Sequence, residues 1–124
     1  MNCTEQQRMD LWQESMELAL LMYRLSRKMP ENEQNFLGNR ARHAAVELSS
    51  KVTEVVTYDA DEPFQKTLSP ALAALTEFEM VLLICDRMGL FTQKETAQLQ
   101  KKDARVRPIL EEMLFSLDAK KLGK

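Results

Sequence analysis

The chain has 124 residues, a length typical of one domain, of which 44% are hydrophobic and 29% are charged. This balance excludes both a disordered chain and one embedded in a membrane. The formal net charge of −2 excludes a general attraction to phosphate, so a nucleic-acid site would need a local basic patch. Only three glycines and four prolines interrupt a composition rich in good helix formers. We therefore expect a single all-α domain over residues 1–124.

The first two expected helices are separated by a proline. The first begins at a capping box, in which Thr4 and Gln7 stand three residues apart, and ends before Pro30 because the residue before a proline avoids helical geometry. The second begins near Asn32 and ends before a polar joint at 58–63. The sequence as a whole predicts helices at about residues 4–28, 32–57, 63–88 and 92–120.

The last two expected helices meet at Gly89, the residue type that most often follows the end of a helix. The third begins near Pro63, because proline suits the first helical turn. The fourth begins at a second capping box, formed by Thr92 and Glu95.

Two prolines fall inside these helices, Pro70 in the third and Pro108 in the fourth. Each removes one backbone donor, so the helix either kinks or stops and restarts there. We expect kinks, because the apolar spacing continues across both prolines.

Apolar residues recur every three or four positions in all four segments, which favours near-parallel packing of long helices. Four such helices with short joints predict an antiparallel up-down-up-down four-helix bundle. The residues expected in its core are Met9, Trp12, Met16, Ala19 and Tyr23; Ala41, Ala45, Leu48, Val52 and Val55; Phe64, Leu68, Ala71, Leu75, Phe78, Leu82 and Cys85; and Leu99, Val106, Leu110, Met113 and Leu117, with Asp103 as a polar exception.

The first and third helices carry more apolar surface than one bundle needs, since each is apolar over more than half its circumference. Such surface marks an interface between chains, so we expect a homo-oligomer. The alternative is a single bundle whose loops and helix tilts cover the excess. The residues expected at the oligomer interface are Leu11, Leu18, Met22, Leu25, Arg42, Val81 and Ile84.

Basic residues concentrate in two places. The segment 39–51 places Arg40, the only histidine and Lys51 on one stripe, but Glu47 and Glu54 share that stripe, which favours a solvated or inter-subunit polar face. The fourth helix offers a more plausible phosphate-facing patch. The candidate nucleic-acid-binding residues are Arg40, Lys94, Lys101, Lys102 and Arg105.

The residues that catalysis or metal binding would need are missing. One histidine, His43, cannot supply the two Glu-x-x-His motifs of a di-iron bundle, and Cys3 and Cys85 lack the spacing of a metal site. We expect no enzymatic activity, cofactor, metal or small-molecule substrate. The polar start of the chain and its two isolated cysteines indicate a cytoplasmic protein without membrane anchorage.

Four stretches in order carry a family resemblance. The segment "LWQESMELALLMYRLSRKMP" at 11–30 resembles the first helix of the 23S rRNA intervening-sequence four-helix-bundle proteins. The segments "RHAAVELSSKVTE" at 42–54, "LSPALAALTEFEMVLLICDRMGL" at 68–90 and "LEEMLFSL" at 110–117 are similar to the following helices. The sequence departs from the family pattern at His43, Ser49 and Val55, and in the acidic joint that follows.

The resemblance implies a small cytoplasmic bundle that assembles as a ring, commonly a homopentamer. Related proteins of diversity-generating retroelements imply a partner role with RNA, DNA or a reverse transcriptase. Two hypotheses follow: a non-enzymatic homo-oligomeric scaffold, and alternatively an accessory nucleic-acid-binding protein.

Overall fold

The computed structural model describes residues 4–57 and 61–122, and the side chains of 4–57 and 66–116. The described residues form α-helices and no strand, which confirms the all-α expectation. The helices are α1 (Glu5–Ser26), α2 (Glu31–Gln34), α3 (Leu37–Thr57), α4 (Asp61–Arg87) and α5 (Gln93–Leu122).

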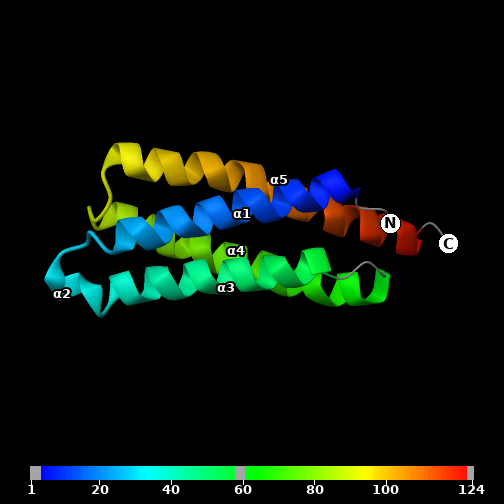
Figure 1. The fold of residues 1–124 in the computed structure, drawn as a ribbon, viewed down its shortest axis with the longest axis horizontal. Coiled ribbons are helices and arrows are strands. Elements are labelled where there is room, and N and C mark those ends of the chain that lie inside the picture. Colours follow the sequence, from blue (N-terminus) through cyan, green and yellow to red (C-terminus); the bar gives the residue numbers. More distant parts are fainter. Residues whose placement is uncertain (1–3, 58–60, 123–124) are drawn as a thin grey trace.

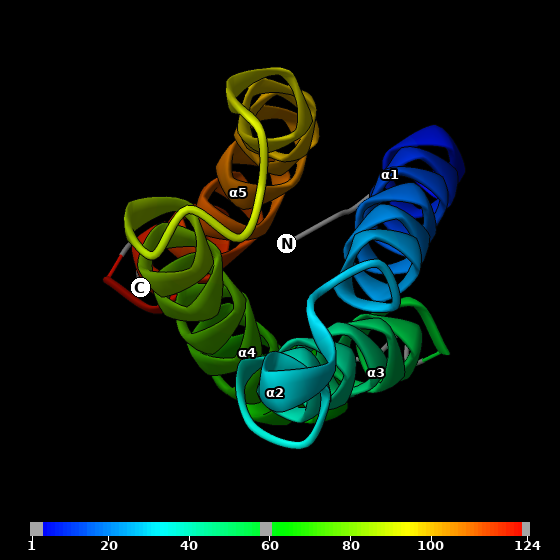
Figure 2. The ribbon, with the colours of Figure 1, turned by 90° about the vertical axis from the view of Figure 1, so that its left-hand side faces the viewer.

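The four long helices lie side by side, and successive ones run in opposite directions along the long axis (Figure 1). Viewed from one end, α1, α3, α4 and α5 follow one another around the centre (Figure 2). α1 packs against α3 and α5, while α4 packs against α3 and α5. The short α2 contacts α3 and lies in the connection between α1 and α3.

Both predicted capping boxes are present. The backbone N–H of Gln7 donates to Thr4 Oγ1 at 3.0 Å, and the backbone N–H of Thr4 donates to Gln7 Oε1 at 3.0 Å. At the start of α5, Glu95 N–H donates to Thr92 Oγ1 at 3.1 Å and Thr92 N–H donates to Glu95 Oε1 at 2.9 Å. Each box supplies partners to N–H groups that a helix start leaves unsatisfied.

The end of α4 confirms the prediction at Gly89. Its φ of +75° lies in the left-handed region, where a glycine has no Cβ penalty. The Leu90 N–H donates to the Cys85 carbonyl at 2.9 Å and the Gly89 N–H to the Asp86 carbonyl at 3.0 Å. These two bonds form a Schellman motif, which ends α4 and turns the chain toward α5.

The predicted core rows of the last three long helices are buried wherever their side chains are described. Phe64 and Leu117 lie outside the described side chains. The confirmed rows are Ala41, Ala45, Leu48, Val52 and Val55 of α3; Leu68, Ala71, Leu75, Phe78, Leu82 and Cys85 of α4; and Leu99, Val106, Leu110 and Met113 of α5.

The prediction for α1 is wrong, because its two apolar rows are exchanged. Leu11, Leu18 and Met22 have no exposed surface and belong to the core, together with Leu25. Of the row expected inside, only Ala19 is buried, whereas Trp12 is 41% exposed and Met9 is 55% exposed. The Leu-rich row therefore fills the interior, and the row with Trp and Tyr lies outside.

The predicted second helix is interrupted at residues 35 and 36, which separate α2 from α3. The side-chain amide of Gln34 donates to the carbonyls of Ser26, Arg27 and Met29 at 3.1, 3.2 and 2.8 Å. It thereby satisfies carbonyls at the end of α1 that have no partner within that helix.

α4 continues through Pro70 and α5 continues through Pro108, so neither proline divides its helix. Among the residues that the structure describes, one helical segment, Lys66–Arg87 of α4, is long and apolar enough to cross a membrane by length and composition alone. Of its most apolar window, 44% is buried inside the fold, and a core helix of a folded protein passes the same test.

Candidate self-association and nucleic-acid surfaces

An apolar surface runs along the outside of α1 and continues onto α3. Met9, Trp12, Leu20 and Tyr23 are all exposed, although Trp and Tyr are among the largest side chains available. We call this surface the α1/α3 face; it consists of Met9, Trp12, Met16, Leu20 and Tyr23 of α1 with Val46 and Val56 of α3.

The two halves of the α1/α3 face are adjacent. Met9, Trp12 and Val56 line one open pocket of about 330 Å³ at one end of the face. At the other end, Arg42 of α3 donates to Ser26 Oγ of α1 at 3.3 Å. Because α1 and α3 run in opposite directions, this register brings Tyr23 level with Val46.

The polar side chains of α3 on this face are turned to local partners. Ser49 Oγ donates to the Val46 carbonyl at 3.0 Å, and Thr53 Oγ1 donates to the Ser49 carbonyl at 2.7 Å. Hydroxyls that bond back to their own helix need no other partner. The face can therefore be covered by apolar atoms without leaving these donors unsatisfied.

A second exposed apolar surface lies on α4. We call it the α4 face; it consists of Met80, Leu83 and Ile84. Ile84 is exposed in the single chain, which an interface residue has to be. Its place at an oligomer interface stays a prediction. Val81 is buried in the core with 3% exposure, so its expected place at an interface is wrong.

The predicted interface residues of α1 also need correction. Leu11, Leu18, Met22 and Leu25 pack inside the chain and offer no surface to a second copy. Their mutual spacing is the same as that of the exposed row, so periodicity alone could not separate the two rows. A usable signal was present: Trp and Tyr carry polar groups that favour the boundary with water, whereas Leu carries none.

Arg42, also expected at the interface, is engaged within the chain. Its guanidinium donates to the Gln34 side-chain oxygen at 3.0 Å and to the Gln34 carbonyl at 2.7 Å. Gly38 allows this approach, since a Cβ there would lie 3.2 Å from Arg42 Nη1 and from the Glu33 carbonyl oxygen. Arg42 therefore fixes the connection between α1 and α3.

The candidate nucleic-acid-binding residues fall into two groups. Arg40 pairs with Glu77 of α4 and Lys102 with Glu17 of α1 at 3.1 Å, and Arg105 lies 3.6 Å from a carboxylate oxygen of Glu14 on α1. The hydrogen bond and positive charge of Lys102 lower the pKa of Glu17. These three cations already face carboxylates, which reduces their attraction for phosphate.

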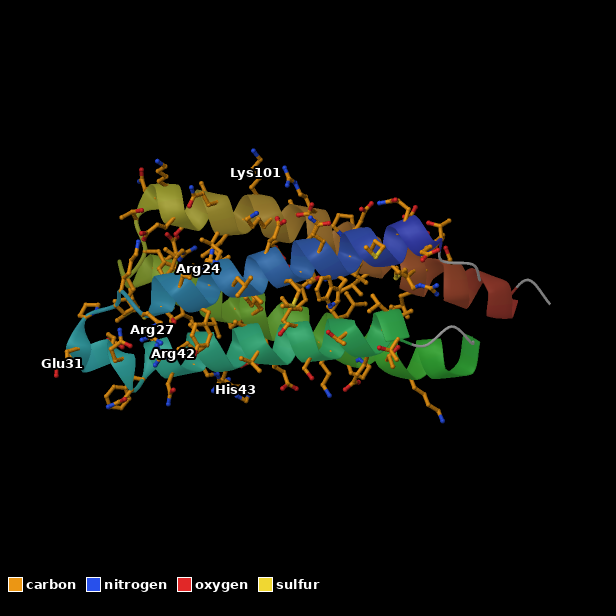
Figure 3. The ribbon with its side chains drawn as sticks, viewed as in Figure 1. Arg24, Arg27, Glu31, Arg42, His43 and Lys101 are labelled. Carbon is orange, nitrogen blue, oxygen red and sulfur yellow. The ribbon has the colours of Figure 1, made fainter. Side chains whose placement is uncertain are left out.

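Lys94 and Lys101 form the second group, because both are exposed and neither has an ion pair with any residue that the structure describes. Arg24 and Lys28 of α1 share these properties, although no sequence pattern predicted them as part of this surface. Figure 3 shows Lys101 pointing outward from α5 and places Arg24 on the neighbouring α1. We call Arg24, Lys28, Lys94 and Lys101 the basic edge.

The stretch 39–51 forms one wall of an open groove of about 500 Å³ between α3 and α4. Arg40, His43, Glu47 and Lys51 line it, as expected for a stripe of mixed charge. Lys51 lies 4.0 Å from Glu47, the spacing predicted for a pair on one helix face. The stripe is thus a charged surface in which acids and bases alternate.

The described residues offer little support for metal or thiolate chemistry. No group of three or more His, Cys, Asp or Glu side chains among them could hold a metal ion. Burial raises the pKa of Cys85 to about 11, with the charge of Glu33 adding to the effect, so the thiol stays protonated at neutral pH.

The molecule is thus an all-α protein with exposed apolar surfaces on α1, α3 and α4. It belongs to the 23S rRNA-intervening sequence protein family, whose model matches residues 7–112. The match spans the first three stretches that carry the resemblance and the first three residues of the fourth, and it confirms the family. A comparison with curated proteins finds no match to the chain.

Proposed function

We propose that the chain is a non-enzymatic, up-down-up-down four-helix bundle that self-associates in the cytoplasm and acts as a scaffold. The α1/α3 face carries this proposal. It presents exposed apolar side chains along α1 and on α3, two of them aromatic, and exposed apolar patches mark interaction sites. Trp and Tyr are also the residue types that contribute most at protein interfaces.

A second copy of the chain is the partner that these surfaces favour. The α1/α3 face and the α4 face lie on different helices, so one copy can present the first to the second of its neighbour. Such head-to-tail contacts close into a ring when the rotation between copies allows it. A ring, commonly of five chains, is what the family resemblance implies.

The test compares the mass of the assembly before and after a charge is placed in the α1/α3 face. Trp12→Glu should reduce the mass measured by light scattering during size exclusion to that of one chain, 14.3 kDa. The far-ultraviolet circular dichroism should stay helical, because Trp12 is 41% exposed and is not one of the core residues. Ala97→Glu, which introduces the same charge at an exposed position of α5, should leave the assembly intact.

Two results contradict self-association through the α1/α3 face. The first is a wild-type protein that elutes as a single chain at micromolar concentration. The second is a Trp12→Glu variant that keeps the wild-type mass, which would show that the α1/α3 face is free in the assembly.

A second candidate function is nucleic-acid binding, or binding to a nucleic-acid-processing protein. The basic edge favours it, because its four cations have no carboxylate partner among the described residues. The paired residues Arg40, Lys102 and Arg105 would contribute less than the sequence analysis expected.

Gel retardation of a short RNA duplex at low salt tests this second candidate. The double variant Lys94→Glu/Lys101→Glu should abolish retardation, and wild-type binding should weaken steeply with salt because phosphate contacts release counterions. Lys66→Glu, at an exposed position of α4, is the matched control. Equal binding by both variants would refute a role for the basic edge.

A further inference from the structure

The boundary between α4 and α5 contains a charged cluster that neither proposed function uses. Arg107 of α5 holds both carboxylate oxygens of Glu79 of α4, with Nε to Oε2 at 2.8 Å and Nη2 to Oε1 at 2.7 Å. Its other donors reach Thr76 Oγ1 at 3.0 Å and Glu111 Oε2 at 3.1 Å. Four of the five guanidinium N–H groups therefore have partners, and two of them clamp Glu79.

Asp103 lies one helical turn before Arg107 and completes the cluster. Its carboxyl group lines the same pocket as the Glu79 carboxylate, and its Oδ1 is buried without a hydrogen-bond partner among the described residues. Two ionised carboxylates in contact repel each other, so the pair is stable only when one proton lies between them. Because Arg107 keeps Glu79 ionised, the proton resides on Asp103 and is donated to Glu79.

The ionisation of the two carboxyls agrees with this geometry. Burial raises the pKa of Asp103 to about 7, and the hydrogen bond and negative charge of Glu79 act in the same direction. Burial also acts to raise the pKa of Glu79, but the hydrogen bonds from Arg107 and Asp103 outweigh it and lower that pKa.

The other charged groups near this boundary have partners of their own. Asp86 of α4 lines the same pocket as Asp103 and accepts a hydrogen bond from Thr96 Oγ1 at 2.8 Å. On the α1 side of α5, Lys102 lies 3.1 Å from Glu17 and Arg105 lies 3.6 Å from Glu14. Of these acids, Glu79 is the one whose hydrogen bond and charge act on the pKa of Asp103.

An open pocket of about 390 Å³ is lined by Glu79, Asp86, Asp103 and Arg107. Water can reach the carboxyl pair through it, so the proton can exchange without unfolding of the chain.

We propose that Asp103 and Glu79 form a proton-dependent latch between α5 and α4, closed when Asp103 is protonated and loosened when it ionises. The latch is independent of self-association and of nucleic-acid binding, since none of its residues belongs to the α1/α3 face, the α4 face or the basic edge.

The direction of the pH effect follows from the raised pKa. An unfolded aspartate titrates near 3.8, so between that pH and about 7 the folded chain holds a proton that the unfolded chain has lost. The stabilisation by this proton is complete below the unfolded pKa and is lost as the pH rises through about 7. Glu79 has a lowered pKa, so its stabilisation is lost only as the pH falls through that lowered value, at the acidic end.

Thermal unfolding between pH 5.5 and 8.5 tests the latch. The wild-type Tm should fall by several degrees across neutrality, and the Asp103→Asn variant should lack this fall, because an amide donates to Glu79 at every pH. The control Asp86→Asn, in the same pocket, should keep the wild-type pH dependence. An Asp103→Asn variant with the wild-type slope would overturn the proposal.

A second measurement uses the wild-type protein alone, in case the variant fails to fold. Carbon-13 NMR of the side-chain carboxyls, assigned through the backbone, should show Asp103 titrating near neutrality. A titration in the ordinary range of aspartate would overturn the latch whatever the variants do.

Discussion

The α1/α3 and α4/α5 boundaries are built from the same helical repeat, but the side chains that they expose to solvent differ in polarity. At the first, apolar residues continue from the core to the surface, and the hydroxyls beside them bond back to their own helix. At the second, the outer layer is an ion pair and a carboxyl pair that link the two helices. The first surface can accept another chain, whereas the second uses its polar groups to fasten neighbours within the chain.

The largest expected effect is a difference in stability loss between substitutions on the buried and on the exposed face of α1. Leu18→Ala should lower the free energy of unfolding by about 3 kcal/mol, because Leu18 is fully buried and its truncation leaves a cavity. Leu20→Ala, at a residue that is 45% exposed, should cost less than about 1 kcal/mol in the single chain. Urea unfolding of both variants measures the difference, and equal losses would contradict the assignment of core and surface on α1.

The next effect tests the α4/α5 boundary. Arg107→Leu should lower the free energy of unfolding by about 2 kcal/mol, since it leaves Glu79 and Asp103 facing each other without a guanidinium. Arg105→Leu is the matched control, because its contact with Glu14 is longer and half-exposed and should be worth at most about 0.5 kcal/mol. Chemical denaturation at pH 7 compares the two variants. Similar losses in the free energy of unfolding would show that the bonds from Arg107 to Glu79 do not stabilise the α4/α5 boundary.

A smaller effect concerns the turn that joins α4 to α5. Gly89→Ala should cost about 1 kcal/mol, because an alanine at a φ of +75° is strained. Gly89→Asn should cost less, since asparagine tolerates the left-handed region better than other residues with a side chain. Thermal unfolding should give a lower Tm for Gly89→Ala than for Gly89→Asn. A Gly89→Ala variant with the wild-type Tm would show that the turn can adopt another conformation.

The smallest expected effect comes from replacing a threonine by valine at each of the two boundaries. Thr76→Val removes a hydroxyl that accepts from Arg107, and should cost roughly 0.5–1 kcal/mol. Thr53→Val removes a hydroxyl bonded only to its own helix, and should change stability by less than about 0.5 kcal/mol. Thermal unfolding gives both values, and a larger loss at Thr53 would reverse the contrast between the two boundaries.

Features that depend on neighbours in the chain could be predicted from the sequence. The capping boxes at Thr4 and Thr92 and the turn at Gly89 need only residues a few positions apart. The core rows of α3, α4 and α5 were also predictable, because in each of those helices one apolar row keeps its spacing along nearly the whole element; the second apolar set of α4 is confined to its C-terminal part.

Features that depend on how the helices pack against one another could not be predicted from the sequence in the same way. α1 has two rows of equal period, and only packing against α3 and α5 decides that Leu18 lies inside and Trp12 outside. Asp103 stood out as a polar residue in an apolar row, but its partner Glu79 is set by the register of α4 against α5. The bonds of Arg42 required the turn at 35–36, which periodicity does not reveal.

The link between Gln34 and Arg42 has a consequence for how the chain opens. The last carbonyl of α1, that of Ser26, and two carbonyls just beyond it are held by Gln34, and Gln34 is held by Arg42 of α3. Helix ends normally fray independently of one another. Because Gln34 links them, the last turn of α1 and the first turns of α3 should lose their protection against hydrogen exchange together, as one cooperative unit.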